Sequence, residues 1–173
     1  MSALAHLHGL GHRRIALVCG KSDRNDRAFE RRRAYTEFLR RKRIRISAEL
    51  IEERYFEFDE GEAAMRRILR CRRRPTAVFC ANDILAVGAM HACRDLGLEI
   101  PGDISIMGFD DHPITEHVTP PLSTVRVPAE RMGQCATEAL MHSIATAEAP
   151  ASRVLPTELV VRGSTAPPRR APG

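Results

Sequence analysis

Short apolar runs alternate along this chain with longer segments of helical periodicity, and this alternation restricts the fold more than any other feature. Runs typical of buried strands span 14–20, 76–81 and the turn-plus-strand segment 100–109, and a further strand is expected near 49–56. Helical spacing of apolar residues covers about 26–43, 60–70 and 83–97. Strands that are apolar on both faces and separated by helices predict an α/β fold, with a parallel sheet sandwiched by helices.

The alternation stops after Asp111. An irregular, proline-closed stretch follows, then a brief extended piece, a helix from Pro128 to about Thr146, and one or two strands near 153–163. We therefore divide the chain into an α/β unit, a crossover segment, a separate helix, a returning extended segment and a flexible tail. Their ranges are 1–111, 112–127, 128–150, 151–163 and 164–173.

The composition fits a globular protein without a membrane partner. The chain has 173 residues, enough to bury a core, and 43% of them are hydrophobic. No apolar stretch approaches the roughly 20 residues that cross a bilayer. The first residues, MSALAHLHGLGHRR, lack the apolar core and cleavage site of a secretory signal, so we expect a cytoplasmic location.

The net charge of +5 is concentrated in two arginine runs, at 40–45 and 66–75. Such a patch can bind a phosphate backbone without sequence specificity. Both runs also fall at the ends of predicted helices, where arginine meets the negative end of the helix macrodipole. We favour a solvated face over a nucleic-acid contact.

Polar and aromatic residues follow the strands of the predicted sheet. Asp110 and Asp111 come directly after the fourth strand, Asn82 after the third and Phe56 after the second, while Arg31 shares the inward stripe of the first helix. Ligands of such sheets bind outside the carboxyl ends of the strands. An acid, a guanidinium, an amide and an aromatic ring suit a small polyhydroxylated ligand. Alternatively, the aspartates and Asn82 simply cap a turn or a helix.

No pattern supports catalysis, a metal or a cofactor. The chain has no GxSxG, no phosphate-binding P-loop and no GxGxxG after its first strand. The five cysteines are scattered without a CxxC pair, which favours buried thiols over zinc or disulfides, and the seven histidines suit solvated or structural roles. Asp110 and Asp111 have the chemistry of an acid–base pair, but no nucleophile or metal set accompanies them.

Several motifs together resemble the LacI/GalR family of bacterial transcriptional repressors. They are HLHGLGHRRIALVCG, RAFERRRAYTEFL, the stretch PTAVFCANDILAVGAMHACRDLGLEIPGDISIMGFDD, TPPLSTVRVPAERMG and LPTELVVRGST, which occur in that order across residues 4–166. The resemblance implies a periplasmic-binding-protein-like sensor with two α/β lobes that clamp a sugar or nucleobase. A solute-binding protein of a sugar uptake system, which shares these lobes, is the alternative.

The resemblance also assigns roles to residues. Arg31, Asn82 and Asp110 match effector-contacting positions of the family, and Phe56 matches an aromatic that stacks on the ligand. It implies a homodimer through the helices at 57–69 and 82–97 and the loop at 113–118. It further implies that residues 1–111 form most of one lobe and that 128–150 belong to the other, largely absent lobe. DNA would be bound only through a helix-turn-helix that this sequence lacks.

One departure from the family pattern concerns the ligand. Where the family often has a polar residue and an aromatic after the PPL segment, this chain has Val127 and Ala129. The identity of the effector, and whether it induces or co-represses, is therefore left open.

Overall fold

Four parallel strands form the centre of the molecule, as the alternating pattern predicts. The computed structural model describes residues 1–23 and 25–169. The strands are β1 (Ile15–Gly20), β2 (Ile51–Arg54), β3 (Ala77–Cys80) and β4 (Ser105–Met107), and they lie side by side in the order β2-β1-β3-β4. A short antiparallel pair, β5 (Thr124–Arg126) and β6 (Glu158–Val160), is separate from this sheet. Isolated parallel bridges join Met107 to Ser123 and Asp110 to Arg126, so the β5 segment runs beside β4.

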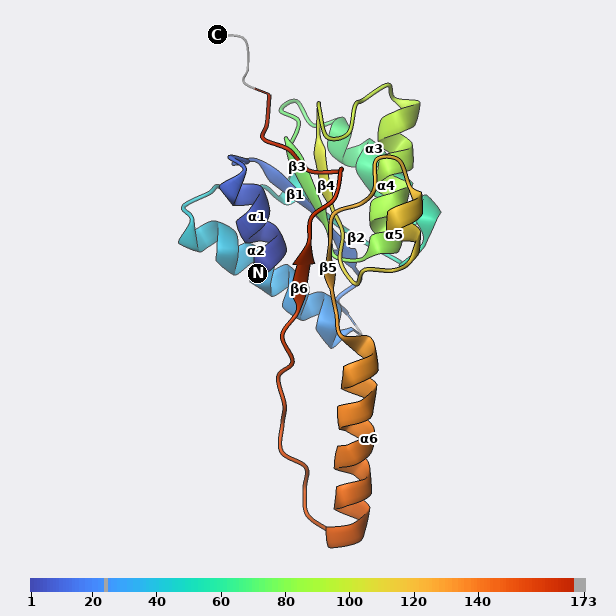
Figure 1. Cartoon of the computed structure of the whole chain (residues 1–173). Helices are drawn as coiled ribbons and strands as arrows, with labels where there is room; N and C mark the ends of the chain where they lie inside the picture. The colour runs from blue at the N-terminus through green and yellow to red at the C-terminus, as the bar shows by residue number, and fades with distance from the viewer. Residues whose placement is uncertain (24, 170–173) are drawn as a thin grey trace.

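Helices cover both faces of the sheet (Figure 1). They are α1 (Ser2–Gly9) and α2 (Asp26–Arg41) on one face, and α3 (Phe58–Leu69) and α4 (Asp83–Asp95) on the other. Successive side chains of β1 point to opposite faces: Leu17 joins the core under α1 and α2, while Val18 joins the core under α3 and α4. All six residues of β1 are buried, as expected for a strand that is apolar on both faces. The expected sandwich is confirmed.

The element boundaries differ from expectation at the start of α3, in the crossover segment and before β2. Helix α3 begins at Phe58 rather than near 60, because Asp59 and Glu60 then occupy its first turn, where acidic side chains meet the positive end of the macrodipole. The stretch expected to be irregular contains a single turn, α5 (Ile114–His117), closed by a hydrogen bond of 2.9 Å from the amide of Thr115 to the carbonyl of His112. A 3-10 turn at Ala48–Leu50 precedes β2.

The tail also differs from expectation. Residues 164–173 were expected to be loosely held, yet Ser164 is fully buried and donates to the carbonyl of Ile106 at 2.6 Å. The carbonyl of Ala166 accepts from Ser105 at 3.0 Å and lies 2.9 Å from the ring of His12. The expectation is therefore wrong for 164–166, because these polar partners are spread along the sequence and leave no local pattern. Residues 170–173 lie outside the described residues.

Helix α6 (Ala129–Thr146) projects from the rest of the molecule, and the chain returns beside it towards β6 (Figure 1). All of α6 lies in the described part of the chain, and none of its side chains is buried. Leu140, Met141 and Ile144 are exposed to 60, 62 and 72%. This helix therefore presents apolar side chains that the described residues leave uncovered. Across residues 1–23 and 25–169, no helix combines the length and the apolar character needed to cross a membrane.

Candidate functional site

The four residues that the sequence singles out line one cavity at the carboxyl edge of the sheet. The cavity has a volume of about 550 Å³. Arg31 reaches it from α2, while Phe56, Asn82 and Asp110 follow β2, β3 and β4. The other lining residues come from the start of α2 and from the chain around the start of α6: Asn25, Arg27, Ala28, Val127, Ala129 and Met132. A hollow of this size is typical of small-molecule sites.

Arg31 is held in place by two hydrogen bonds and an aromatic ring. Its guanidinium donates to the carbonyl of Ala81 at 2.6 Å and to the Oδ1 atom of Asp110 at 3.1 Å. The guanidinium carbon lies 4.2 Å from the centre of the Phe109 ring, which is a cation–π distance. A guanidinium has five N–H donors, so this arrangement fixes Arg31 and still leaves donors that can face a ligand.

Asn82 serves both as a helix cap and as a cavity residue, the two interpretations that its position left open. Its Oδ1 atom accepts from the amide of Ile84 at 2.9 Å and so caps α4. Its side-chain amide donates to the Oδ2 atom of Asp110 at 2.8 Å. Asp110 thus accepts from Asn82 with one oxygen and from Arg31 with the other, and its side chain remains 34% exposed.

Phe56 supplies an aromatic face to the cavity. The residue is 41% exposed, and its ring lies directly against Gly20, the last residue of β1. A Cβ atom at position 20 would overlap the ring, so the glycine is what allows Phe56 to lie there. The end of β1 therefore positions the aromatic residue that follows β2.

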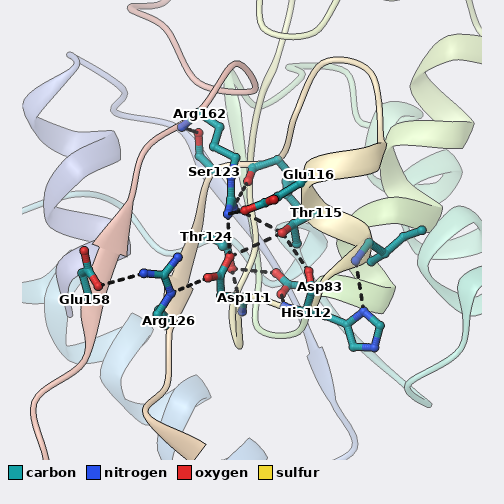
Figure 2. A network of polar contacts seen from close by, with 12 residues as sticks. Asp83, Asp111, His112, Thr115, Glu116, Ser123, Thr124, Arg126, Glu158 and Arg162 are labelled. Carbon is teal, nitrogen blue, oxygen red and sulfur yellow. Dashed lines mark hydrogen bonds and ion pairs between the residues drawn. The ribbon is translucent and has the colours of Figure 1, made fainter.

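Asp111 faces away from the cavity into a second polar cluster, shown in Figure 2. Its Oδ2 atom accepts from Arg126 at 2.6 Å, and its Oδ1 atom accepts from Arg162 at 2.9 Å. Burial alone would raise the pKa of Asp111, but the hydrogen bonds from these two arginines outweigh it and lower the pKa. The neighbouring aspartates thus have separate partners, and the acid–base pair weighed from the sequence does not form.

The same cluster contains Asp83, the first residue of α4. Asp83 is fully buried and accepts from Thr124 at 2.7 Å and from the amide of His112 at 2.8 Å. Burial raises its pKa to about 6, although both hydrogen bonds act in the opposite direction. Asp83 and Asp111 together attach the turn after β4 to β5 (Figure 2).

Sequence reasoning missed several cavity residues. Asn25 follows β1 and caps α2 by accepting from Ala28 at 3.0 Å, so the rule of polar residues after strands would have found it. Met132 reaches the cavity from α6, more than a hundred residues from Asn25. No spacing in the sequence indicates that Met132 and Asn25 line the same cavity.

Comparisons with known proteins identify the class to which this fold and cavity belong. The family model of the periplasmic binding protein-like domain matches residues 4–165. This chain therefore belongs to the periplasmic binding protein-like domain family. The family likeness read from the sequence motifs is confirmed, because the relatives are HTH-type transcriptional regulators and the matching solved structures are LacI family regulators.

Two relatives and three solved structures define the likeness further. The chain is 41% identical over 179 residues to the HTH-type transcriptional regulator MalR of Streptomyces coelicolor and 40% identical over 180 residues to the regulator reg1 of Streptomyces lividans, in each case over 99% of this chain. It spans 49 and 50% of those relatives' lengths.

Among solved structures, a LacI family regulator from Mycobacterium smegmatis matches with a TM-score of 0.89 and 36% identity, over 96% of this chain and 62% of its own. A complex of the regulator CelR with cellobiose matches with a TM-score of 0.87 and 34% identity, over 94% and 50%. A dimeric Lac repressor matches with a TM-score of 0.88 and 31% identity, over 96% and 60%. These relatives are regulators rather than enzymes, and they do not favour the sugar-uptake alternative.

Proposed function

We propose that this chain is the effector-sensing part of a LacI-type transcriptional regulator and that the cavity at the carboxyl edge binds a small sugar-like molecule. One observation carries the proposal: Arg31, Phe56, Asn82 and Asp110, which follow or face separate strands, line a single hollow. The likeness to the CelR–cellobiose complex supports a sugar rather than another small molecule. A nucleobase-containing ligand is the second candidate in the same cavity.

The chemistry of the cavity suits vicinal hydroxyl groups. The carboxylate of Asp110 has lone pairs beyond those used by Arg31 and Asn82, so it can accept from a ligand hydroxyl. Arg31 can donate to the neighbouring hydroxyl oxygen, and charged partners make such bonds stronger than neutral ones. The exposed face of Phe56 can cover the apolar face of a sugar ring. These residues bind and orient a ligand, and we infer that the chain does not transform it.

We further infer that residues 128–150 belong to a second lobe, for which this chain supplies only part. The exposed apolar side chains of α6 and the half-length match to the relatives support this inference. Since Ala129 and Met132 of this segment also line the cavity, a bound ligand would contact both lobes and favour one arrangement of the two. A structure of a longer gene product in which α6 contacts nothing further would contradict this part of the proposal.

We infer that the chain forms a homodimer and acts in the cytoplasm. The dimer surface would include α3, α4 and the segment 113–118, where Phe58 is 47% exposed and Ile84 and Val87 are partly exposed. The likeness to a dimeric Lac repressor supports it. DNA would be bound through a segment outside this sequence. Sedimentation equilibrium that shows only monomer at high concentration would contradict the dimer.

A calorimetric titration with a panel of sugars and nucleosides, cellobiose included, tests the binding role. The Asp110→Asn variant should bind the best ligand at least about tenfold more weakly, because a charged hydrogen bond contributes about 1.5–3 kcal/mol. The exposed Glu148→Gln variant removes the same charge far from the cavity and should bind like the wild type. Equal affinity of the Asp110→Asn variant and the wild type would reject the site.

A further inference from the structure

The two arginine runs, which the proposed function does not use, converge at the amino edge of the sheet. A hollow of about 480 Å³ lies there. Its lining residues are Arg13, Arg14, Arg45, Ser47, Glu49, Arg72 and Arg73. They lie in the segments that directly precede β1, β2 and β3, which are adjacent in the sheet order β2-β1-β3. We refer to this hollow as the arginine pocket.

Arg14 holds the walls of the arginine pocket together. It donates to the carbonyl of Arg73 at 2.7 Å and to the carboxylate of Glu49 at 2.7 Å, and the hydroxyl of Ser47 donates to the same carboxylate at 3.1 Å. The segments before β1, β2 and β3 are thereby tied to one another. Glu49, the acid among these lining residues, is therefore already paired.

The other four arginines of the pocket lack an acid at ion-pair distance in the described part of the chain. Within residues 1–23 and 25–169, Arg13, Arg45, Arg72 and Arg73 form no ion pair, whereas many other arginines do, among them Arg31 and Arg66. Arg13 instead donates to the carbonyls of His8 and His12. Four like charges around one hollow repel one another unless an anion lies between them.

Arg13 meets the last turn of α1 through the carbonyl of His8, but helix macrodipoles do not account for Arg45, Arg72 and Arg73. The negative ends of α2 and α3 face this edge of the sheet, but the effect is confined to the last helical turn. Arg40 and Arg41 occupy the last turn of α2, and Arg66 and Arg67 that of α3. Arg45 follows the last turn of α2, and Arg72 and Arg73 follow that of α3, so all three belong to the loops.

We propose that the arginine pocket binds a small molecule with two or more phosphate groups. Arginine forks match phosphate oxygens in paired hydrogen bonds, and four unpaired guanidinium groups around one hollow suit an anion of several charges. The volume is in the range of small-molecule sites. A small anion fits better than a nucleic acid, because the arginines line a hollow made by three loops rather than a track along one helix.

This site is independent of the proposed sugar site. Arg14 precedes β1 and Gly20 ends it, and a strand of six residues spans about 20 Å. The two cavities therefore lie at opposite edges of the sheet. Occupation of one is not needed to form the other.

Calorimetric titration of the chain with inorganic triphosphate, orthophosphate and a random 20-base-pair DNA duplex tests the proposal. Triphosphate should bind more tightly than orthophosphate, and added sodium chloride should weaken its binding. The Arg45→Gln/Arg72→Gln variant should bind triphosphate at least about tenfold more weakly. Both side chains are exposed, so circular dichroism should show an unchanged fold.

A matched control is Arg40→Gln/Arg131→Gln, which removes the same charge. Both side chains are exposed, and neither lines the sugar cavity or the arginine pocket, although Arg40 belongs to the same run as Arg45. This control should keep its triphosphate affinity within about twofold, less than the loss of one charged hydrogen bond. Equal weakening of both variants, or weakening of the control alone, would overturn the proposal. Loss of DNA binding in the pocket variant without any triphosphate binding would assign the pocket to nucleic acid instead.

Discussion

Asp110 and Asp111 are adjacent in the chain, but their carboxylates serve different parts of the molecule. Both residues have a positive φ, 108° for Asp110 and 57° for Asp111, a conformation that few residues other than glycine adopt. This backbone turns one carboxylate towards Arg31 and Asn82 and the other towards Arg126 and the C-terminal segment. The sequence located the two acids but could not predict that their side chains point in different directions. The partners of Asp111 are far away in the chain, and residue type alone does not determine the backbone angle φ of the two aspartates.

Asp83 should make stability depend on pH. Its pKa rises from 3.8 to about 6 in the folded protein, so the unfolded chain loses this proton first as the pH rises. The stabilising contribution of Asp83 is therefore largest below about pH 3.8, and it is lost as the pH rises from about 3.8 to about 6. At 1.36 kcal/mol per pKa unit, the loss amounts to up to about 3 kcal/mol.

The Asp83→Asn variant isolates this effect. Asparagine keeps an acceptor for His112 and can donate to Thr124, but it does not ionise. In urea unfolding at pH 4, 5, 6 and 7, the free energy of unfolding of the variant minus that of the wild type should increase with pH by up to about 3 kcal/mol. Asp111, which has a lowered pKa, makes the same contribution to the pH dependence of unfolding in both proteins, so its contribution cancels in the difference. A difference that stays constant with pH would contradict the buried, protonated state.

At the scale of elements, α3 and α4 approach each other more closely than large side chains would allow. A Cβ atom at Gly61 would meet the carbonyl of Leu85, and one at Gly88 would meet the carbonyl of Phe58. Two helices of the expected dimer surface thus pack backbone to backbone. The apolar spacing of each helix was readable from the sequence. Their close approach was not readable from the sequence, because a glycine within a helix can also be a residue that is merely tolerated there and marks no contact.

Replacing Gly88 by alanine should therefore destabilise the protein by about 1–3 kcal/mol, the usual cost of overpacking. In an open helix the same change would stabilise by up to about 1 kcal/mol. Gly133 in α6 provides this control, because a Cβ atom there has nothing within 4 Å. Urea unfolding at a fixed protein concentration compares the two. Equal effects of Gly88→Ala and Gly133→Ala would show that the α3–α4 contact is looser than described.

At the scale of the whole molecule, the sequence predicted the sheet and the edge at which polar residues gather, but not how the chain closes on itself after Asp111. Periodicity reports local burial, and β1, β3 and α2 have strong local patterns. Ser164 and Arg162 are held by partners about 40 to 60 residues away, which no local pattern reveals. Helix α6 was located from its spacing, although its apolar stripe lies uncovered by the described residues.

The central claim is that the cavity lined by Arg31, Phe56, Asn82 and Asp110 binds a sugar-like ligand. A crystal structure of the chain grown with the sugar that binds most tightly tests it directly. We expect hydroxyl groups of the sugar within hydrogen-bond distance of Asp110 and Arg31, with the sugar ring against Phe56. A sugar bound instead beside α6 or in the arginine pocket, with this cavity free of it, would contradict the account.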